Sequence, residues 1–182
     1  MLKKTPKYSQ IIHKERVWFI RKLREWVQNN GSKNVVYFDE SGFVSESYRP
    51  HGWAKRGQKV HGRVSGNNRK KTNLIMAQRK DEWLAPMLFE GSCTHHTVSA
   101  WLENGLAKEL DEPSLIIMDN APFHNKPHMK EILEAKGHTM LPLPKYSPDL
   151  NPIEKSFAII KKRRQYSKQS LEDIIIRNYK VK

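Results

Sequence analysis

Two aspartates stand at the ends of short apolar runs in the sequence. Asp39 closes the run NVVYFD at 34–39, and Asp119 closes a second run, SLIIMD at 114–119. Both runs have the composition of buried strands. Open α/β sheets place their sites at the carboxyl ends of strands, so two such strands lying side by side would bring the two carboxylates together.

Glu154 supplies a third carboxylate from a predicted helix, NPIEKSFAIIKKRRQ, in which Asn151 and Pro152 suit the N-cap and the first turn. Repulsion and desolvation disfavour the convergence of three carboxylates. Two Mg²⁺ ions about 3.5–4 Å apart would offset the repulsion between the carboxylates. They would also activate the attacking oxygen and stabilise the leaving oxygen of a phosphoryl displacement. Carboxylate oxygens are the hard ligands that Mg²⁺ prefers. The pattern therefore favours metal-dependent phosphoryl transfer.

Each carboxylate also has a purely structural interpretation. Asp39 could open a turn at the ESG that follows it, and Asp119 could form an Asx turn. Glu154 stands where a capping-box glutamate would reach back to Asn151. Glu40 is a further carboxylate, but strand alternation points it away from Asp39. Taken singly, the residues leave these interpretations open.

The charge of the chain points to a polyanionic partner. The 182 residues include 33 Lys and Arg against 19 Asp and Glu, a net charge of +14. This excess is typical of nucleic-acid binding, although an anionic membrane surface or ribosomal RNA would also fit. One cysteine excludes a disulfide framework, and no apolar run approaches the ~20 residues of a membrane span. We expect a cytoplasmic protein that binds no membrane.

The positive charge is concentrated in two segments. Residues 55–71 hold seven Lys or Arg and no acid, and their glycines and asparagines indicate a hairpin and turns. The segment could be a solvated loop, but the absence of acids favours a flap along a phosphate backbone. The second segment, KKRR, ends the helix that begins near Glu154, where cations also complement the helix dipole. The predicted DNA contacts are Lys55, Arg56, Lys59, Arg63, Arg69, Lys70, Lys71, Lys161 and Lys162.

The elements that must position these residues follow from hydrophobic periodicity and turn signals. Antiparallel strands come first and are followed by alternating helices and strands, which predicts an α/β protein with a mixed sheet flanked by helices. The length predicts one such domain. We expect helices at 10–28, 94–110 with Thr94 as N-cap, 127–136, 151–165 and 170–179, and strands at 34–39, 49–57, 70–79, 83–91, 114–119 and 139–144.

Three strings around the carboxylates resemble the catalytic motifs of a known family. FDESGF contains Asp39, IMDNAPFH contains Asp119, and YSPDLNPIEKSF contains Glu154. Together they resemble the mariner-like superfamily of transposases, and most closely its bacterial insertion-sequence branch with an Asp-Asp-Glu triad. The 34 residues between Asp119 and Glu154 are typical of that branch. The resemblance covers roughly residues 33 to 165.

The resemblance implies an RNase H-like fold and a site in which Asp39, Asp119 and Glu154 bind two Mg²⁺ or Mn²⁺ ions. It implies cut-and-paste transposition of an insertion sequence on double-stranded DNA. Water would cleave at the element's ends, and the freed 3′-hydroxyl would attack target DNA, usually at a TA step. Asn120, His124 and Asn151 would support the site, and His124 could contact the scissile phosphate or brace its loop. We expect a homodimer in the bacterial cytoplasm, associated with the nucleoid.

Such transposases usually begin with helix-turn-helix modules, and residues 1–32 are too few to hold them. We therefore expect an N-terminal connector helix in 1–32 and a catalytic domain in 33–182, with an upstream helix-turn-helix protein or a fused frame as a partner. Two other functions stay open. The chain could be an RNase H-like nuclease that only hydrolyses, or a catalytically silent DNA-binding remnant that is decayed or co-opted.

Overall fold

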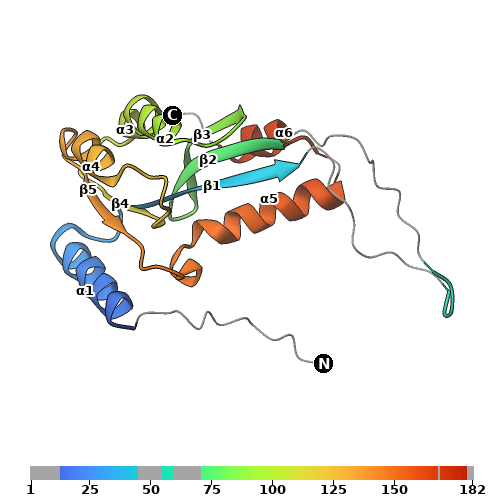
Figure 1. The fold of residues 1–182 in the computed structure, drawn as a ribbon, viewed down its shortest axis with the longest axis horizontal. Coiled ribbons are helices and arrows are strands. Elements are labelled where there is room, and N and C mark those ends of the chain that lie inside the picture. The colour runs from blue at the N-terminus through green and yellow to red at the C-terminus, as the bar shows by residue number, and fades with distance from the viewer. Residues whose placement is uncertain (1–12, 45–54, 60–70, 168, 180–182) are drawn as a thin grey trace.

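A five-stranded mixed sheet forms the centre of the computed structural model, which describes residues 13–44, 55–59, 71–167 and 169–179 (Figure 1). The strand order is β3-β2-β1-β4-β5. The first three strands are antiparallel, whereas β4 is parallel to β1 and β5 is parallel to β4. This order confirms the predicted mixed sheet. The strands are β1 Val35–Val44, β2 Lys71–Arg79, β3 Glu82–Glu90, β4 Leu115–Met118 and β5 Thr139–Pro142.

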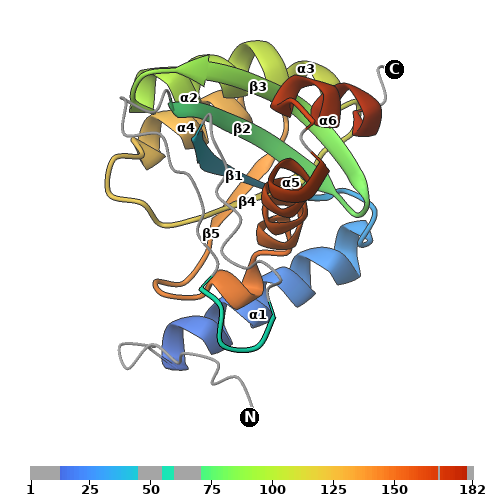
Figure 2. The ribbon, with the colours of Figure 1, turned by 90° about the vertical axis from the view of Figure 1, so that its right-hand side faces the viewer.

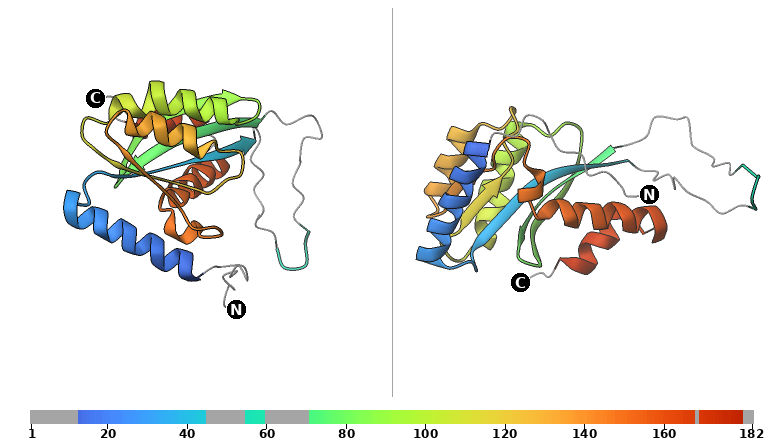
Figure 3. Two further views of the ribbon diagram at one scale, coloured as in Figure 1. Left: turned by 60° about the vertical axis from the view of Figure 1, so that its left-hand side comes forward. Right: turned by 90° about the horizontal axis from the view of Figure 1, so that it is seen from below.

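Helices cover both faces of the sheet (Figure 2). One face packs against α2 His95–Trp101, the π-helical turn η1 Leu102–Leu106 and α4 Lys126–Glu134. The short α3 Ala107–Glu109 follows η1. The other face carries α5 Ile153–Ser167 and α6 Leu171–Asn178 over β1 and β2, and α1 His13–Asn30 over β1, β4 and β5 (Figure 3). None of the helices in the described segments is long and apolar enough to span a bilayer.

Side-chain alternation along β1 divides the core between these two faces. Val36 and Phe38 are buried against α2, η1 and α4, while Phe43 packs against α5 and α6. Val35 contacts the cluster under α1. Asp39 belongs to the set that faces α5, and Glu40 to the set that faces α4. The sheet therefore places its two neighbouring carboxylates on opposite faces.

Strand β1 is longer than the sequence suggested, which corrects the predicted turn after Asp39. The residues ESG continue the strand because they pair with β2, with Ser41 opposite Leu74 and Gly42 opposite Asn73. Asp39 therefore lies in the middle of β1 and not at its carboxyl end. It still reaches an open edge, because the parallel neighbour β4 ends at Met118 and leaves the next part of β1 unpaired on that side.

Most other predicted elements are confirmed within a few residues. Thr94 caps α2 by accepting the backbone N–H of Thr97, but the predicted helix 94–110 is interrupted by the π-helical turn η1. The predicted strand 49–57 is wrong for its described part, because residues 55–59 form a turn closed by a hydrogen bond from Gln58 N to Lys55 O. The rest of that prediction, residues 49–54, lies outside the described residues.

Candidate active site

A cavity of about 490 Å³ opens beside the part of β1 that lies beyond its pairing with β4. Its lining includes Asp39 from β1, Asp119 from the loop after β4 and Glu154 from the first turn of α5. The structure thus brings together the three carboxylates that the sequence singled out. A fourth acid, Glu40, and the predicted supporting residues Asn120 and Asn151 line the same cavity.

Asp39 is held by one hydrogen bond to each carboxylate oxygen. Oδ1 accepts the backbone N–H of Glu40 at 2.8 Å, and Oδ2 accepts the side-chain amide of Asn151 at 3.0 Å. Asn151 is itself buried, and its backbone N–H donates to Pro148 O at 3.0 Å. The predicted side-chain N-cap does not form, because Oδ1 of Asn151 accepts no hydrogen bond among the described residues while the amide N–H binds Asp39 across the site. The capping box does not form either, because the backbone N–H of Asn151 donates to Pro148. Glu154 is exposed at the cavity.

Asp119 is held by the loop that follows it. Its Oδ1 accepts the backbone N–H of Ala121 at 3.1 Å and lies 3.1 Å from Nε2 of His124. The His124 side chain is fully buried, and Nε2 is also 3.6 Å from Oε1 of Glu40. Of the two predicted roles, this geometry favours bracing of the loop over direct contact with a phosphate.

Glu40 is the residue that sequence reasoning missed. It does point to the face opposite Asp39, as alternation requires, yet it reaches the cavity because β4 has already ended at this level. One carboxylate oxygen of Glu40, one of Asp119 and a ring nitrogen of His124 lie within 4.8 Å of one another. This convergence depends on where a neighbouring strand stops, and no local sequence signal reports that.

Burial and the crowding of carboxylates shift the pKa values of the acids in the cavity. Burial and the charges of Asp119 and Glu154 raise the pKa of Asp39 to about 7, against the lowering effects of the Glu40 N–H and of Lys161. Burial and the charges of Asp39 and Asp119 raise the pKa of Glu40 to about 8. For Asp119, burial alone would raise the pKa, but the hydrogen bonds from His124 and Ala121 outweigh it, and its pKa is lowered.

The loop before α5 is tied to α1. Arg16 of α1 makes a bidentate ion pair with Asp149 of η2 Pro148–Leu150, at 2.9 and 2.6 Å. Leu150 packs in the apolar cluster beneath α1. On the other wall, Asn120 accepts a hydrogen bond from the Lys126 ammonium. These contacts hold the loop that carries Asp119 and the loop that leads to Glu154.

Six of the predicted DNA contacts lie in the described part of the chain. Lys161 and Lys162 are exposed on α5, and Nζ of Lys161 lies 5.7 Å from the centre of the Phe43 ring. Lys71 is exposed at the start of β2, and Lys55, Arg56 and Lys59 are exposed in the turn at 55–59. The remaining predicted contacts lie outside the described residues: Arg63, Arg69 and Lys70.

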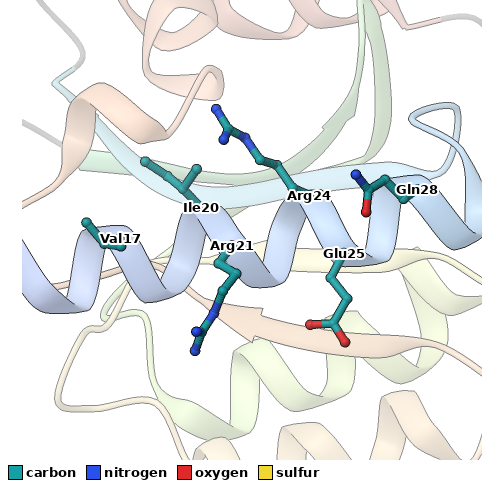
Figure 4. Close-up of a pocket in the computed structure, with 6 residues that line it drawn as sticks. All are labelled: Val17, Ile20, Arg21, Arg24, Glu25 and Gln28. Carbon is teal, nitrogen blue, oxygen red and sulfur yellow. The ribbon is translucent and has the colours of Figure 1, made fainter.

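A second hollow, of about 660 Å³, lies along α1 (Figure 4). One helix forms all of its lining, which includes Val17, Arg21 and Glu25. Arg21 and Glu25 extend from the same side of the helix. The hollow contains one acid and offers no set of converging ligands. The chemistry therefore belongs to the carboxylate cavity.

Comparison with known proteins places the chain in a family. Residues 34–175 match the family model described as DDE superfamily endonuclease. Because this match covers most of the sequence, the chain belongs to the DDE superfamily endonucleases. None of the curated proteins in the comparison matches the chain.

Solved structures confirm the RNase H-like fold. The Mos1 transposase paired-end complex with left transposon end superposes with a TM-score of 0.71 at 20% identity, over 90% of this chain and 53% of that chain. The Mos1 mariner paired end complex with Mn superposes with a TM-score of 0.71 at 19% sequence identity, over 95% of this chain and 56% of that chain. The catalytic domain of Mos1 mariner transposase superposes with a TM-score of 0.62 at 16% sequence identity, over 95% of this chain and 81% of that chain. The chain spans about half the length of the chains in the complexes.

Proposed function

We propose that this chain is the catalytic domain of a DNA transposase, which cleaves DNA and joins the freed 3′-hydroxyl to a target. The observation that carries the proposal is the cavity in which Asp39, Asp119 and Glu154 converge from three separate elements. Membership of the DDE superfamily endonucleases supports it. So does the shared fold with structures of a mariner transposase on transposon ends.

The donor set fits divalent metal ions. Hard cations prefer carboxylate oxygens, and the cavity offers four acids. Two of them have raised pKa values, so the pocket is under electrostatic strain that a cation would relieve. Oε1 of Glu40 is buried and has no hydrogen-bond partner among the described residues. We propose two Mg²⁺ or Mn²⁺ ions held by Asp39, Asp119 and Glu154.

When bound, such ions would supply Lewis-acid activation of the attacking oxygen and stabilisation of the leaving oxygen. The chain's own residues would orient the ligands. Asn151 fixes one oxygen of Asp39, and His124 fixes one oxygen of Asp119. Glu154, exposed in the first turn of α5, would complete the set. Preorganised ligands of this kind reduce the rearrangement needed when the substrate phosphate arrives.

We further propose that the partner is double-stranded DNA. The substrates would be the ends of an insertion sequence and a target DNA, usually at a TA step. The net charge of +14 supports this, as do the exposed lysines on α5 and around 55–59. We propose that 33–182 is the catalytic domain and that 1–32 connects it to a helix-turn-helix module or partner. The family match beginning at residue 34 supports this division. The active form would be a homodimer acting on DNA in a bacterial cell.

An oligonucleotide assay with Mn²⁺ tests the proposal. The wild type should both nick a duplex and join a 3′-hydroxyl end to a second duplex. Asp39→Ala, Asp119→Ala and Glu154→Ala should each abolish joining, non-additively, because the ligands act as one unit. Glu103→Ala, which removes an exposed acid on η1, is the matched control.

The products separate the three candidate functions. Nicking without joining would identify a nuclease of this fold, and DNA binding without either reaction would identify a silent remnant. Near-normal joining by Glu154→Ala would contradict the assignment of that ligand.

A further inference from the structure

The five residues from Leu143 to Ser147 form a strap between β5 and η2 that lines one wall of the carboxylate cavity. Both ends of the strap are anchored. The backbone N–H of Leu143 donates to Met118 O at 2.7 Å, and Leu143 is buried. Ser147 is also buried, and its hydroxyl donates to Lys145 O at 3.2 Å. Between these anchors the strap presents Lys145 and Tyr146 at the surface of the cavity.

Tyr146 has a backbone conformation that is unusual for a large side chain. Its φ is +55°, in the left-handed region that glycine adopts without steric cost. Core packing does not account for the tyrosine, because 48% of the residue is exposed. Strained residues of this kind cluster at active sites and ligand clamps. The strap therefore holds a tyrosine in the lining of the carboxylate cavity at a conformational cost.

A second exposed aromatic residue lies on the loop that carries Asp119. Phe123 is 44% exposed, and its ring centre is 4.2 Å from that of His124. The loop residues just before it, from Asp119 to Pro122, line the cavity. Two partly exposed aromatic residues thus lie on the two loops that border the acids, and one of them, Tyr146, follows Lys145 in the strap.

We propose that Tyr146 stacks on an unpaired nucleobase next to the phosphate that enters the carboxylate cavity. A base within a duplex is already stacked on both neighbours, so a protein ring stacks most readily on a base that has left the helix. Lys145 contacts the adjoining phosphate. The site would then favour DNA with an unpaired nucleotide, such as a frayed end or a flipped base. The inference deepens the proposed function, since it requires that DNA occupies this cavity.

Binding to a duplex that carries one unpaired 2-aminopurine tests the proposal, with Ca²⁺ in place of Mn²⁺ to occupy the acids. The wild type should quench the 2-aminopurine fluorescence and bind this duplex at least about 5-fold more tightly than the fully paired one. Tyr146→Ala should lose both the quenching and the preference, and Tyr146→Phe should keep both. Tyr146→Gly removes the ring and relieves the positive φ, so it separates lost stacking from failed folding.

Tyr166→Ala is the matched control, because Tyr166 is also 48% exposed but lies near the far end of α5. It should bind as the wild type does. A wild type without preference, or a preference retained by Tyr146→Ala and Tyr146→Gly, would overturn the stacking proposal. Mn²⁺-dependent cleavage is measured separately. A Tyr146-dependent preference without any cleavage would overturn the proposed function and leave the stacking intact.

Discussion

Replacement of Glu40 by Gln should stabilise the metal-free protein, and the gain should grow with pH. The Glu40 side chain is only 12% exposed, and its pKa is raised to about 8 by burial and by the charges of Asp39 and Asp119. Glutamine has nearly the same volume and carries no charge. The replacement breaks no hydrogen bond at Oε1, because that oxygen has no partner among the described residues.

The sign and size of the effect follow from linkage. Between the ordinary glutamate pKa of 4.5 and the folded value of about 8, the folded protein binds more protons at Glu40 than the unfolded chain does. The unfolding free energy therefore falls as pH rises through this window, by up to about 1.36 kcal/mol for each pH unit. The unfolding free energy of the wild type can therefore fall by at most about 4 kcal/mol between about pH 5 and pH 8 because of Glu40. Relaxation of the protein and water around the cavity would reduce this fall. We therefore expect Glu40→Gln to raise the free energy of unfolding by ~2 kcal/mol at about pH 8 and by almost nothing near pH 4.

Urea denaturation with a chelator present, repeated across this pH range, measures the difference directly. Glu103→Gln, at an exposed position on η1, should unfold as the wild type does at every pH. Adding Mn²⁺ should shrink the advantage of Glu40→Gln, because a bound cation also neutralises the pocket. A stability difference of constant size at all pH values would refute the reasoning, since it would indicate altered packing and not a suppressed ionisation.

Three further outcomes follow from the site. Mn²⁺ should raise the melting temperature of the wild type but hardly that of Asp119→Asn, and equal shifts would place the ions elsewhere. The double variant Lys161→Gln, Lys162→Gln should weaken binding to all DNA sequences alike, and it should lower the slope of log affinity against log salt by ~0.9 per lost contact. An unchanged slope would mean that neither lysine contacts a phosphate. A double-mutant cycle on Arg16→Gln and Asp149→Asn should give a coupling energy of ~1 kcal/mol in unfolding, and additivity would contradict the bidentate ion pair.

The sequence was most informative where local pattern decides structure. The apolar runs before Asp119 and after Asn151 form β4 and the buried stripe of α5, in which Ile153, Phe157 and Ile160 are buried. Periodicity suffices here because burial of one face stabilises these elements wherever the rest of the chain lies. The predicted N-cap Thr94 also forms.

Local sequence patterns did not predict the contacts between segments that are distant in the chain. The ESG after Asp39 has turn composition, yet pairing with β2 overrides that local preference and extends β1. Asn151 was expected to cap its own helix, but its amide binds Asp39, 112 residues away in the chain. Glu40 reaches the cavity only because β4 stops at Met118. Each of these outcomes depends on which segments become neighbours, and no window of sequence contains that information.

The same long-range contacts connect α1 to the acids. Arg16 holds Asp149, and Leu150 packs in the cluster beneath α1, immediately before Asn151, which binds Asp39. Glu154 follows in the first turn of α5. Because α1 also buries Phe19 against β1, β4 and β5, it is packed as part of this fold. A displacement of α1 would therefore move the segment that positions two of the three proposed ligands. If residues 1–32 do connect to a DNA-recognition module, that module's docking would act on the geometry of the site through Arg16 and Asp149.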